Sequence, residues 1–301
     1  MSNVIAVVWD FDKTLVDGYM QDPIFEKYGV DSSSFWNEVN ALPDKYQKQE
    51  IRVNKDTIYL NQFIRDAHEG GRFAGLTNSD LKNFGKELKF YPGVPEIFVA
   101  TKNIIDSNQT YKNYDIKLEH YIVSTGMRKI IEGSTVMEYV TDVWGCDLIE
   151  DPDTHIISEL GYTIDNTSKT RALFEINKGV PTHPEIDVNA QMPESMRRVH
   201  FANMIYIADG PSDVPAFSVV KKNGGATFAV YPPNDKKAFA QVERLREDSR
   251  IDMYAEADYS AGKTAYMWIE NKIKEFADRI VNSEKQKLAD SVSSAPHHIT
   301  E

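Results

Sequence analysis

Four short groups of polar residues in this sequence carry side chains that could act together on an anionic ligand. Carboxylates bind hard divalent cations such as Mg²⁺, whereas hydroxyl groups, backbone amides and lysine bind the oxygens of phosphate. Taken singly, each group is also typical of a helix N-cap, a solvated lysine or an ordinary turn. The groups are Asp10, Asp12 and Thr14; Ser124, Thr125 and Gly126; Lys169; and Asp209 and Asp213.

The first acid pair directly follows six uncharged residues, Val4–Trp9. A continuous apolar run rich in Val and Ile is typical of a strand that is covered on both faces, as in the middle of a parallel α/β sheet. A turn with two solvated acids is the alternative interpretation. Because ligands bind at the carboxyl ends of strands in open α/β sheets, the position of Asp10 and Asp12 favours a functional site.

The other groups also follow strand-like segments or begin helices. Ser124–Gly126 come at the end of the strand-like "EHYIV", where we predict a polar turn and then a helix. Lys169 begins the helix predicted within "NTSKTRALFEINKG", and Asp209 follows the apolar "NMIYIA". Three separate strand ends would therefore deliver acids, a hydroxyl and amides to one edge of one sheet.

The segments between these groups predict the architecture that positions them. From residue 19 to residue 88, apolar residues recur at helical spacings and no strand-like segment intervenes. Beyond that point strands alternate with helices. We predict an α/β fold, with a Rossmann-like doubly wound parallel sheet over residues 1–18 and 89–284 and a small all-helical cap over residues 19–88. Residues 285–301 lack apolar periodicity, which predicts a disordered tail.

Composition narrows the class of protein. The chain has 34 lysines and arginines against 46 acids, a net charge of −12, which argues against a nucleic-acid or anionic-membrane partner. Its single cysteine, Cys146, fits a reducing compartment and is interpreted as structural. We find no secretory signal and no apolar run long enough for a membrane helix, so we expect a cytoplasmic protein. The oligomeric state and the role of the proline-containing loop 180–202 stay open.

The acids themselves predict a metal ion. Gathering Asp10, Asp12, Asp209 and Asp213 at one edge would place about four negative charges close together, which disfavours ionisation. Mg²⁺ would offset this charge, because it typically takes one or two carboxylates, several waters and a substrate phosphate. Lys169 adds one positive charge. A phosphate dianion is then best tolerated if Asp12 arrives protonated, as a general acid requires.

The order of the motifs resembles the haloacid dehalogenase-like superfamily of phosphohydrolases. The motifs are "DFDKTL", "IVST", a lysine at a helix start, and "YIADGPSD". They cover roughly residues 1–18 and 89–230 and are specific as an ordered set. The helical insertion is similar to the small cap of the phosphoserine phosphatase-like branch, and "NTSKTRALFEI" resembles its lysine-bearing helix. The resemblance implies a Mg²⁺-dependent phosphatase acting on a small phosphorylated metabolite.

The resemblance also implies the catalytic roles. Asp10 would be the nucleophile that forms an aspartyl-phosphate. Asp12 would be the general acid for the leaving alcohol and then the base for water. Lys169 would orient the nucleophile and offset phosphoryl charge. Lys178 is a rival for this role, but a lysine near a helix C-terminus is expected from the helix dipole alone.

The remaining motif residues would bind the metal or the phosphate. Asp209 would bind Mg²⁺ beside Asp10 and the Asp12 carbonyl, while Asp213 would support the metal shell or Lys169. The resemblance implies that Ser124, with the nearby amides of Thr125 and Gly126, would hold phosphate oxygens, and that Thr14 would brace the first loop.

Two departures from the family pattern leave alternatives open. Lys13 replaces the commoner small residue between Asp12 and Thr14, and Ala208 stands where the family usually has Gly. Both leave the loop geometry and the rate open. A phosphate- and Mg²⁺-binding scaffold without turnover is therefore the second hypothesis, and phosphotransfer to an acceptor other than water is a third.

Overall fold

The computed structural model describes residues 2–293. Seven strands form one sheet in the order β4-β3-β2-β1-β5-β6-β7, and helices cover it, which confirms the predicted α/β class. Every neighbouring pair is parallel except β3 and β4. The strands are β1 (Val4–Trp9), β2 (Lys117–Met127), β3 (Asp142–Glu150), β4 (Ile157–Tyr162), β5 (Met204–Ala208), β6 (Ala226–Tyr231) and β7 (Met253–Glu256).

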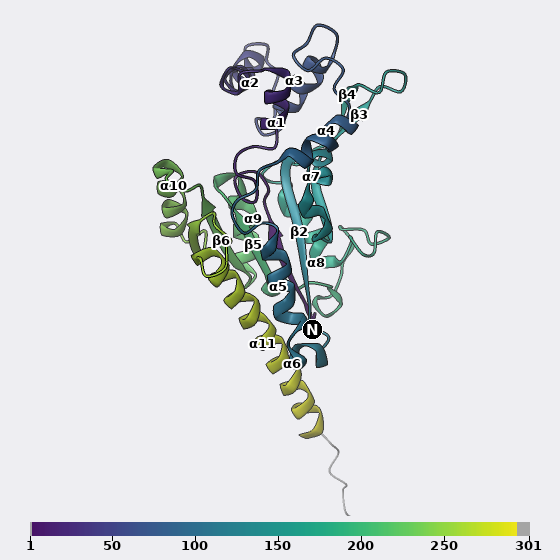
Figure 1. Ribbon diagram of the computed structural model, residues 1–301. Coiled ribbons are helices and arrows are strands. Elements are labelled where there is room, and N and C mark those ends of the chain that lie inside the picture. Colours follow the sequence, from purple (N-terminus) through teal and green to yellow (C-terminus); the bar gives the residue numbers. More distant parts are fainter. Residues whose placement is uncertain (1, 294–301) are drawn as a thin grey trace, which may run out of the picture.

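Strand β1 lies in the middle of the sheet, as its uncharged sequence predicts. Its residues from Ile5 to Trp9 are fully buried, because β2 and β5 flank its edges and helices cover both faces of the sheet (Figure 1). Trp9 pairs with Ile122 of β2 on one side and with Ile207 of β5 on the other. This parallel register brings the ends of β1 and β5 together, so Asp10 and Asp209 follow neighbouring strands at the same edge.

Helices pack on both faces of the sheet, as in a doubly wound fold (Figure 1). Helix α5 packs against α11 on one face, and α8 packs against α9 on the other. The helices of this core are α5 (Glu96–Asp106), α6 (Gln109–Asn113), α7 (Arg128–Gly133), α8 (Lys169–Lys178), α9 (Val214–Lys222), α10 (Lys236–Glu247) and α11 (Thr264–Ser293). Short 3₁₀ helices are η2 (Thr135–Glu138), η3 (Glu194–Met196), η4 (Phe201–Asn203) and η5 (Pro211–Asp213).

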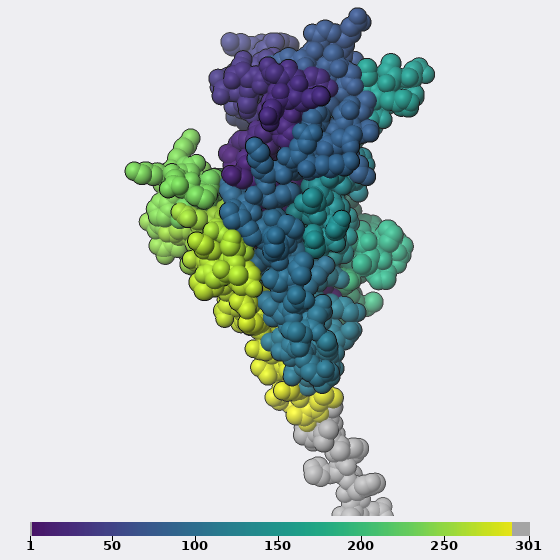
Figure 2. Space-filling view, viewed as in Figure 1, coloured from purple at the N-terminus to yellow at the C-terminus, as the bar shows by residue number. Residues whose placement is uncertain are grey.

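The insertion after β1 is helical and has an aromatic core of its own. The rings of Phe63 and Phe73 stack at 4.7 Å, and Phe25 and Phe35 pack beside them. Figure 2 shows the purple and blue surface of this segment gathered at one end of the molecule. Its elements are α1 (Asp22–Tyr28), α2 (Ser32–Gln47), α3 (Ile58–Ala67), α4 (Asn78–Phe84) and η1 (Gly85–Glu87).

The helices of this insertion also pack against elements of the core. Helix α4 packs against α7, and α3 contacts β4, so core elements also touch the helical segment. The division at residues 18 and 89 stays a prediction.

Strand β4 is an element that the sequence analysis did not predict. It pairs antiparallel with β3 at the edge of the sheet, with Leu148 opposite Leu160. A short turn joins the two strands, and the Asp151 carboxylate accepts the backbone N–H groups of Asp153 and Thr154 there. A short turn permits only an antiparallel pair, because a parallel pair needs a long crossover. The sheet is therefore parallel except at this edge.

The prediction of a disordered tail was wrong for residues 285–293, because α11 continues to Ser293. Two contacts between residues one helical turn apart stabilise this polar end. Lys287 Nζ lies 2.6 Å from Glu284 Oε1, and Gln286 Nε2 donates to Asp290 Oδ1 at 2.8 Å. The rest of the predicted tail, 294–301, lies outside the described residues. Although α11 is long, neither it nor any other helix within residues 2–293 has the apolar stretch that crossing a membrane requires.

Candidate active site

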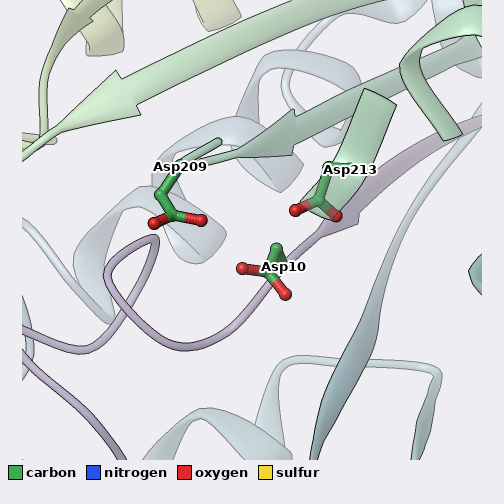
Figure 3. A group of neighbouring side chains, drawn as sticks. All are labelled: Asp10, Asp209 and Asp213. Carbon is green, nitrogen blue, oxygen red and sulfur yellow. The ribbon is translucent and has the colours of Figure 1, made fainter. Parts of the chain in front are cut away.

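Four side chains that lie far apart in the sequence meet at the carboxyl edge of the sheet. The Lys169 ammonium lies 2.7 Å from Asp10 Oδ1 and 2.6 Å from Asp213 Oδ1. One carboxylate oxygen from each of Asp10, Asp209 and Asp213 lies within 4.8 Å of the others. Figure 3 shows the three carboxylates converging from the ends of β1 and β5 and from the turn after β5. We call these three aspartates the acid cluster.

Helix α8 brings Lys169 into the acid cluster because a polar turn fixes where the helix begins. The Asp165 carboxylate accepts the backbone N–H groups of Thr167 and Ser168 at 3.0 and 2.7 Å, which stops the chain just before the first helical residue. That first residue is Lys169, whose side chain is 1% exposed. At the other end Gly179 adopts a left-handed φ of 87°, and its N–H closes the last turn on Glu175.

Lys178, the rival lysine, lies at that other end and has different partners. Its ammonium donates to the backbone carbonyls of Val188 and Ala190, both at 2.5 Å. It therefore anchors the proline-containing loop 180–202. This geometry favours Lys169 as the lysine of the site.

Burial and repulsion by neighbouring carboxylates raise the pKa values of Asp10 and Asp209. Burial, together with Asp213, raises the pKa of Asp10 to about 6, although Lys169 acts in the opposite direction. Burial and the charges of Asp10 and Asp213 raise the pKa of Asp209 to about 8. Burial opposes the charge on Lys169, but Asp10 and Asp213 outweigh it and hold the Lys169 pKa above its ordinary value. One neighbouring lysine is therefore not enough to offset the burial of Asp10 and Asp209 and their repulsion by other carboxylates.

The loop after β1 holds Asp10 and Asp12 in different surroundings. Thr14 Oγ1 donates to Asp10 Oδ2 at 3.3 Å, and the Tyr259 hydroxyl donates to the Thr14 carbonyl at 2.7 Å; the role of Thr14 as a brace stays a prediction. Asp12 Oδ1 accepts the Met20 N–H at 2.8 Å. Burial and the neighbouring Asp10 raise the pKa of Asp12 well above its ordinary value. Burial and the neighbouring charge therefore favour the protonated form of Asp12 more than in an ordinary aspartate.

Lys13 and Ala208, the two departures from the family pattern, lie in the loop after β1 and at the end of β5. Lys13 adopts a left-handed φ of 56°, and its ammonium donates to the Tyr19 hydroxyl at 2.6 Å. Ala208 ends β5 and is fully buried.

The expected polar turn at Ser124–Gly126 is instead part of a strand. Strand β2 continues to Met127, and α7 begins only at Arg128, because a register shift between Val123 and Met127 lets β2 stay paired with β3. The Ser124 hydroxyl is buried and accepts the Gly126 N–H at 2.9 Å. The prediction of a turn was wrong, and the phosphate-binding role of the three residues stays a prediction.

The insertion covers this strand end through direct contacts. A Cβ on Gly126 would lie 2.1 Å from Met20 Cε, so the methionine packs directly on the glycine backbone. Met20 Sδ accepts the Met127 N–H at 3.1 Å, and the Tyr59 hydroxyl donates to the Thr125 carbonyl at 2.9 Å. These contacts hold the helical segment over the end of β2.

A second set of contacts joins the insertion to the start of α8. Asn54 Nδ2 donates to Asp165 Oδ2 at 2.8 Å, and Asp56 Oδ2 accepts the Asn166 N–H at 3.1 Å. The segment that positions Lys169 is thus also a docking point for the insertion.

The acid cluster fits a hard divalent cation. Its donor set consists of carboxylate oxygens, which Mg²⁺ prefers, and burial and the neighbouring carboxylates disfavour the charged forms of Asp10 and Asp209, which a bound cation would stabilise. Within residues 2–293, Lys169 is the one side-chain cation at ion-pair distance from these carboxylates. Mg²⁺ would be held here by Asp10 and Asp209, while two donors already occupy Asp213 Oδ1.

Several residues around the acid cluster were missed by sequence reasoning. The Tyr206 hydroxyl donates to Asp213 Oδ1 at 2.6 Å, and Ser212 Oγ donates to Asp213 Oδ2 at 2.8 Å. Tyr259 supports Thr14 from a distant part of the chain. One signal was available for Tyr206: it is the only hydroxyl in the apolar segment "MIYIA", and a buried tyrosine hydroxyl usually needs a partner.

Comparisons with known proteins give one close relative and several distant structural likenesses. No protein-family model matches the chain. An uncharacterized protein from Borreliella burgdorferi is 38% identical over 288 residues, which cover 90% of this chain and 97% of that protein.

Two solved structures resemble the fold at low identity. A HAD family hydrolase from Salmonella enterica serovar Typhi has a TM-score of 0.50 at 13% identity, covering 84% of this chain and 67% of that one. A probable phosphoserine phosphatase from Vibrio cholerae has a TM-score of 0.49 at 12% identity, covering 92% of this chain and 68% of that one. The chain thus belongs to one family with the Borreliella burgdorferi protein, and its fold is that of the haloacid dehalogenase-like hydrolases.

Proposed function

We propose that this protein is a Mg²⁺-dependent phosphatase that hydrolyses a small phosphomonoester through an aspartyl-phosphate on Asp10. The observation that carries the proposal is the Lys169 ammonium, bound to Asp10 at 2.7 Å and to Asp213 at 2.6 Å beside Asp209. A nucleophilic carboxylate, a fixed cation and further metal-binding carboxylates are the groups that phosphoryl transfer requires.

The proposed reaction has two steps. A carboxylate oxygen of Asp10 attacks phosphorus, the bond from phosphorus to the alcohol oxygen breaks, and Asp12 donates its proton to that oxygen. Water then attacks the aspartyl-phosphate while Asp12 takes the proton of the water, and phosphate leaves with the Asp10 carboxylate restored. The raised pKa of Asp12 supports the first step, because Asp12 begins it as an acid.

The other residues hold the reacting groups and offset charge. Lys169 keeps Asp10 in place and offers its third ammonium proton to a phosphate oxygen. Bound Mg²⁺ would supply positive charge to the phosphate oxygens. Ser124 and the amides near it would bind the remaining oxygens. We further propose that residues 19–88 act as a cap that excludes water, supported by the contacts of Met20 and Tyr59 with the end of β2.

The test compares Asp10→Asn with a matched Asp147→Asn control. Asp147 lies in β3 and pairs with Arg128 outside the acid cluster. With Mg²⁺ and an aryl phosphate, followed by a panel of phosphorylated metabolites, we expect phosphate release by the wild type and the control. Asp10→Asn should lower turnover by at least about 10³-fold, because the covalent route is lost.

Two results would contradict the proposal. Full turnover by a folded Asp10→Asn protein would remove Asp10 as nucleophile. If phosphate and Mg²⁺ raise the melting temperature of the wild type and no phosphomonoester is hydrolysed, the chain is a binding scaffold.

A further inference from the structure

Asp213 is the most heavily hydrogen-bonded carboxylate of the site. Its Oδ1 accepts from Lys169 at 2.6 Å and from the Tyr206 hydroxyl at 2.6 Å, and its Oδ2 accepts from Ser212 Oγ at 2.8 Å. Asp213 and Tyr206 are fully buried, and Lys169 is 1% exposed. Protein donors therefore hold this carboxylate, and the lysine and the tyrosine share one of its oxygens.

Tyr206 is itself held rigidly. It lies in β5, and its ring packs edge-on against Phe217 of α9 at 5.4 Å. Burial and the charge of Asp213 raise its pKa well above the ordinary value for a tyrosine, so its hydroxyl keeps the proton and donates it. The position of Asp213 Oδ1 therefore depends on Tyr206 of β5 as well as on the backbone of η5, which carries Asp213.

We propose that Tyr206 is a positioning residue that, through Asp213 Oδ1, fixes the Lys169 ammonium on Asp10. Without the hydroxyl, the Asp213 carboxylate can rotate about its last side-chain bond. The ammonium, which is bound to the same oxygen, can then follow it away from Asp10. This inference rests on the proposed function for its catalytic consequence, but the geometric part does not depend on turnover.

The matched pair of variants is Tyr206→Phe and Tyr121→Phe. Tyr121 is also a buried strand tyrosine, and its hydroxyl donates to the Glu119 carboxylate at 2.5 Å, away from the acid cluster. With an aryl phosphate, we expect Tyr206→Phe to lower kcat about tenfold while KM stays within about twofold, because one hydrogen bond to a charged group is lost. Tyr121→Phe should leave both constants unchanged.

A second measurement separates this inference from the proposed function. In protein labelled at lysine, the ¹⁵Nζ and ¹³Cε resonances of Lys169 report the surroundings of the ammonium whether or not the protein turns over a substrate. We expect them to shift in Tyr206→Phe and to stay in place in Tyr121→Phe. Unchanged Lys169 resonances in a folded Tyr206→Phe protein overturn the inference, even if the protein proves to be a phosphatase.

The wild type provides a test if Tyr206→Phe does not fold. A hydroxyl proton held on a buried carboxylate exchanges slowly with water, so we expect a resolved Tyr206 hydroxyl resonance with a nuclear Overhauser effect to the Lys169 side chain. A rapidly exchanging hydroxyl without that effect would show that Tyr206 does not hold the shared oxygen.

Discussion

The two ends of helix α8 each bury a lysine, and the two ammonium groups have opposite kinds of partner. At the N-terminal end Lys169 lies between the carboxylates of Asp10 and Asp213. At the C-terminal end Lys178 donates to the neutral carbonyl oxygens of Val188 and Ala190. The same residue type on one helix therefore belongs in one case to the acid cluster and in the other to a loop anchor.

The helix dipole accounts for the contrast between Lys169 and Lys178. A cation is favoured at the C-terminal end of a helix and disfavoured at the N-terminal end, where the free N–H groups carry partial positive charge. Lys178 follows this preference, and its position needs no further partner of opposite charge. Lys169 opposes it and is offset by two carboxylates. A residue placed against the local electrostatic preference is thus a better indicator of a site than one that follows it.

Lys169→Met should have a much stronger effect on turnover than Lys178→Met. Lys169→Met leaves Asp10 and Asp213 without their cation, so turnover should fall at least about 10²-fold and the free energy of unfolding without Mg²⁺ by about 3 kcal/mol. Lys178→Met should keep turnover within about threefold and lose about 1 to 3 kcal/mol, because two carbonyl groups lose a donor. Steady-state kinetics and urea unfolding measure both; equal losses of turnover would mean that the two ends do not differ in function.

We also expect pH and Mg²⁺ to change stability through the acid cluster at the N-terminal end of α8, and not through the Lys178 contacts at its C-terminal end. The pKa values of about 6 for Asp10 and about 8 for Asp209 exceed the unfolded value of about 3.9, so the folded chain holds more protons in this window. The contribution of these groups to the free energy of unfolding therefore falls as pH rises from about 4 to 8. Mg²⁺ near 100 times its Kd should add about 2.7 kcal/mol, with a larger effect at about pH 8 than at about pH 6.

Thermal melting with and without Mg²⁺ checks this prediction. Lys178→Met should keep the full Mg²⁺ response, whereas Asp209→Asn should lose most of it and should melt at a higher temperature than the wild type in the absence of metal. A Mg²⁺ response that is the same at both pH values and survives Asp209→Asn would place the metal elsewhere.

Loss of the contact between the insertion and the start of α8 should have only a modest effect. Asn54→Ala removes the 2.8 Å hydrogen bond to Asp165, which is worth about 1 kcal/mol, so KM should rise about fivefold with little change in kcat. Lys48→Ala is a suitable control, because it is an exposed residue of the same insertion. If Asn54→Ala instead lowers kcat and leaves KM unchanged, this contact positions Lys169 and does not help to hold the insertion closed over the site.

Much of this fold could be predicted from the sequence because its signals are local. Burial on both faces makes β1 uncharged, and the amphipathic faces of α2 and α3 give them helical periodicity. The meeting of Asp10 with Lys169 and Asp213 could be anticipated for a different reason. In a doubly wound sheet the carboxyl ends of the parallel strands lie at one edge. Motifs that follow different strands are therefore brought near one another.

The features that were missed depend on tertiary pairing. Residues Ser124–Gly126 look like a turn in the sequence, but the register shift against β3 keeps them in β2. Strand β4 exists because a short turn folds it back on β3, which its own exposed sequence does not reveal. The end of α11 is mostly polar and carries ion pairs such as Glu284 with Lys287, which a search for apolar periodicity cannot detect.

The packing of Met20 on Gly126 has a consequence for anyone who redesigns this protein. An alanine at position 126 would place its methyl group 2.1 Å from the methionine methyl, and the methionine is fully buried and so has little room to retreat. The two positions, 106 residues apart, therefore behave as one unit in a mutant library. A substitution at only one of the two positions mostly creates a steric clash or a cavity. Paired substitutions that conserve the summed side-chain volume keep the contact between insertion and sheet.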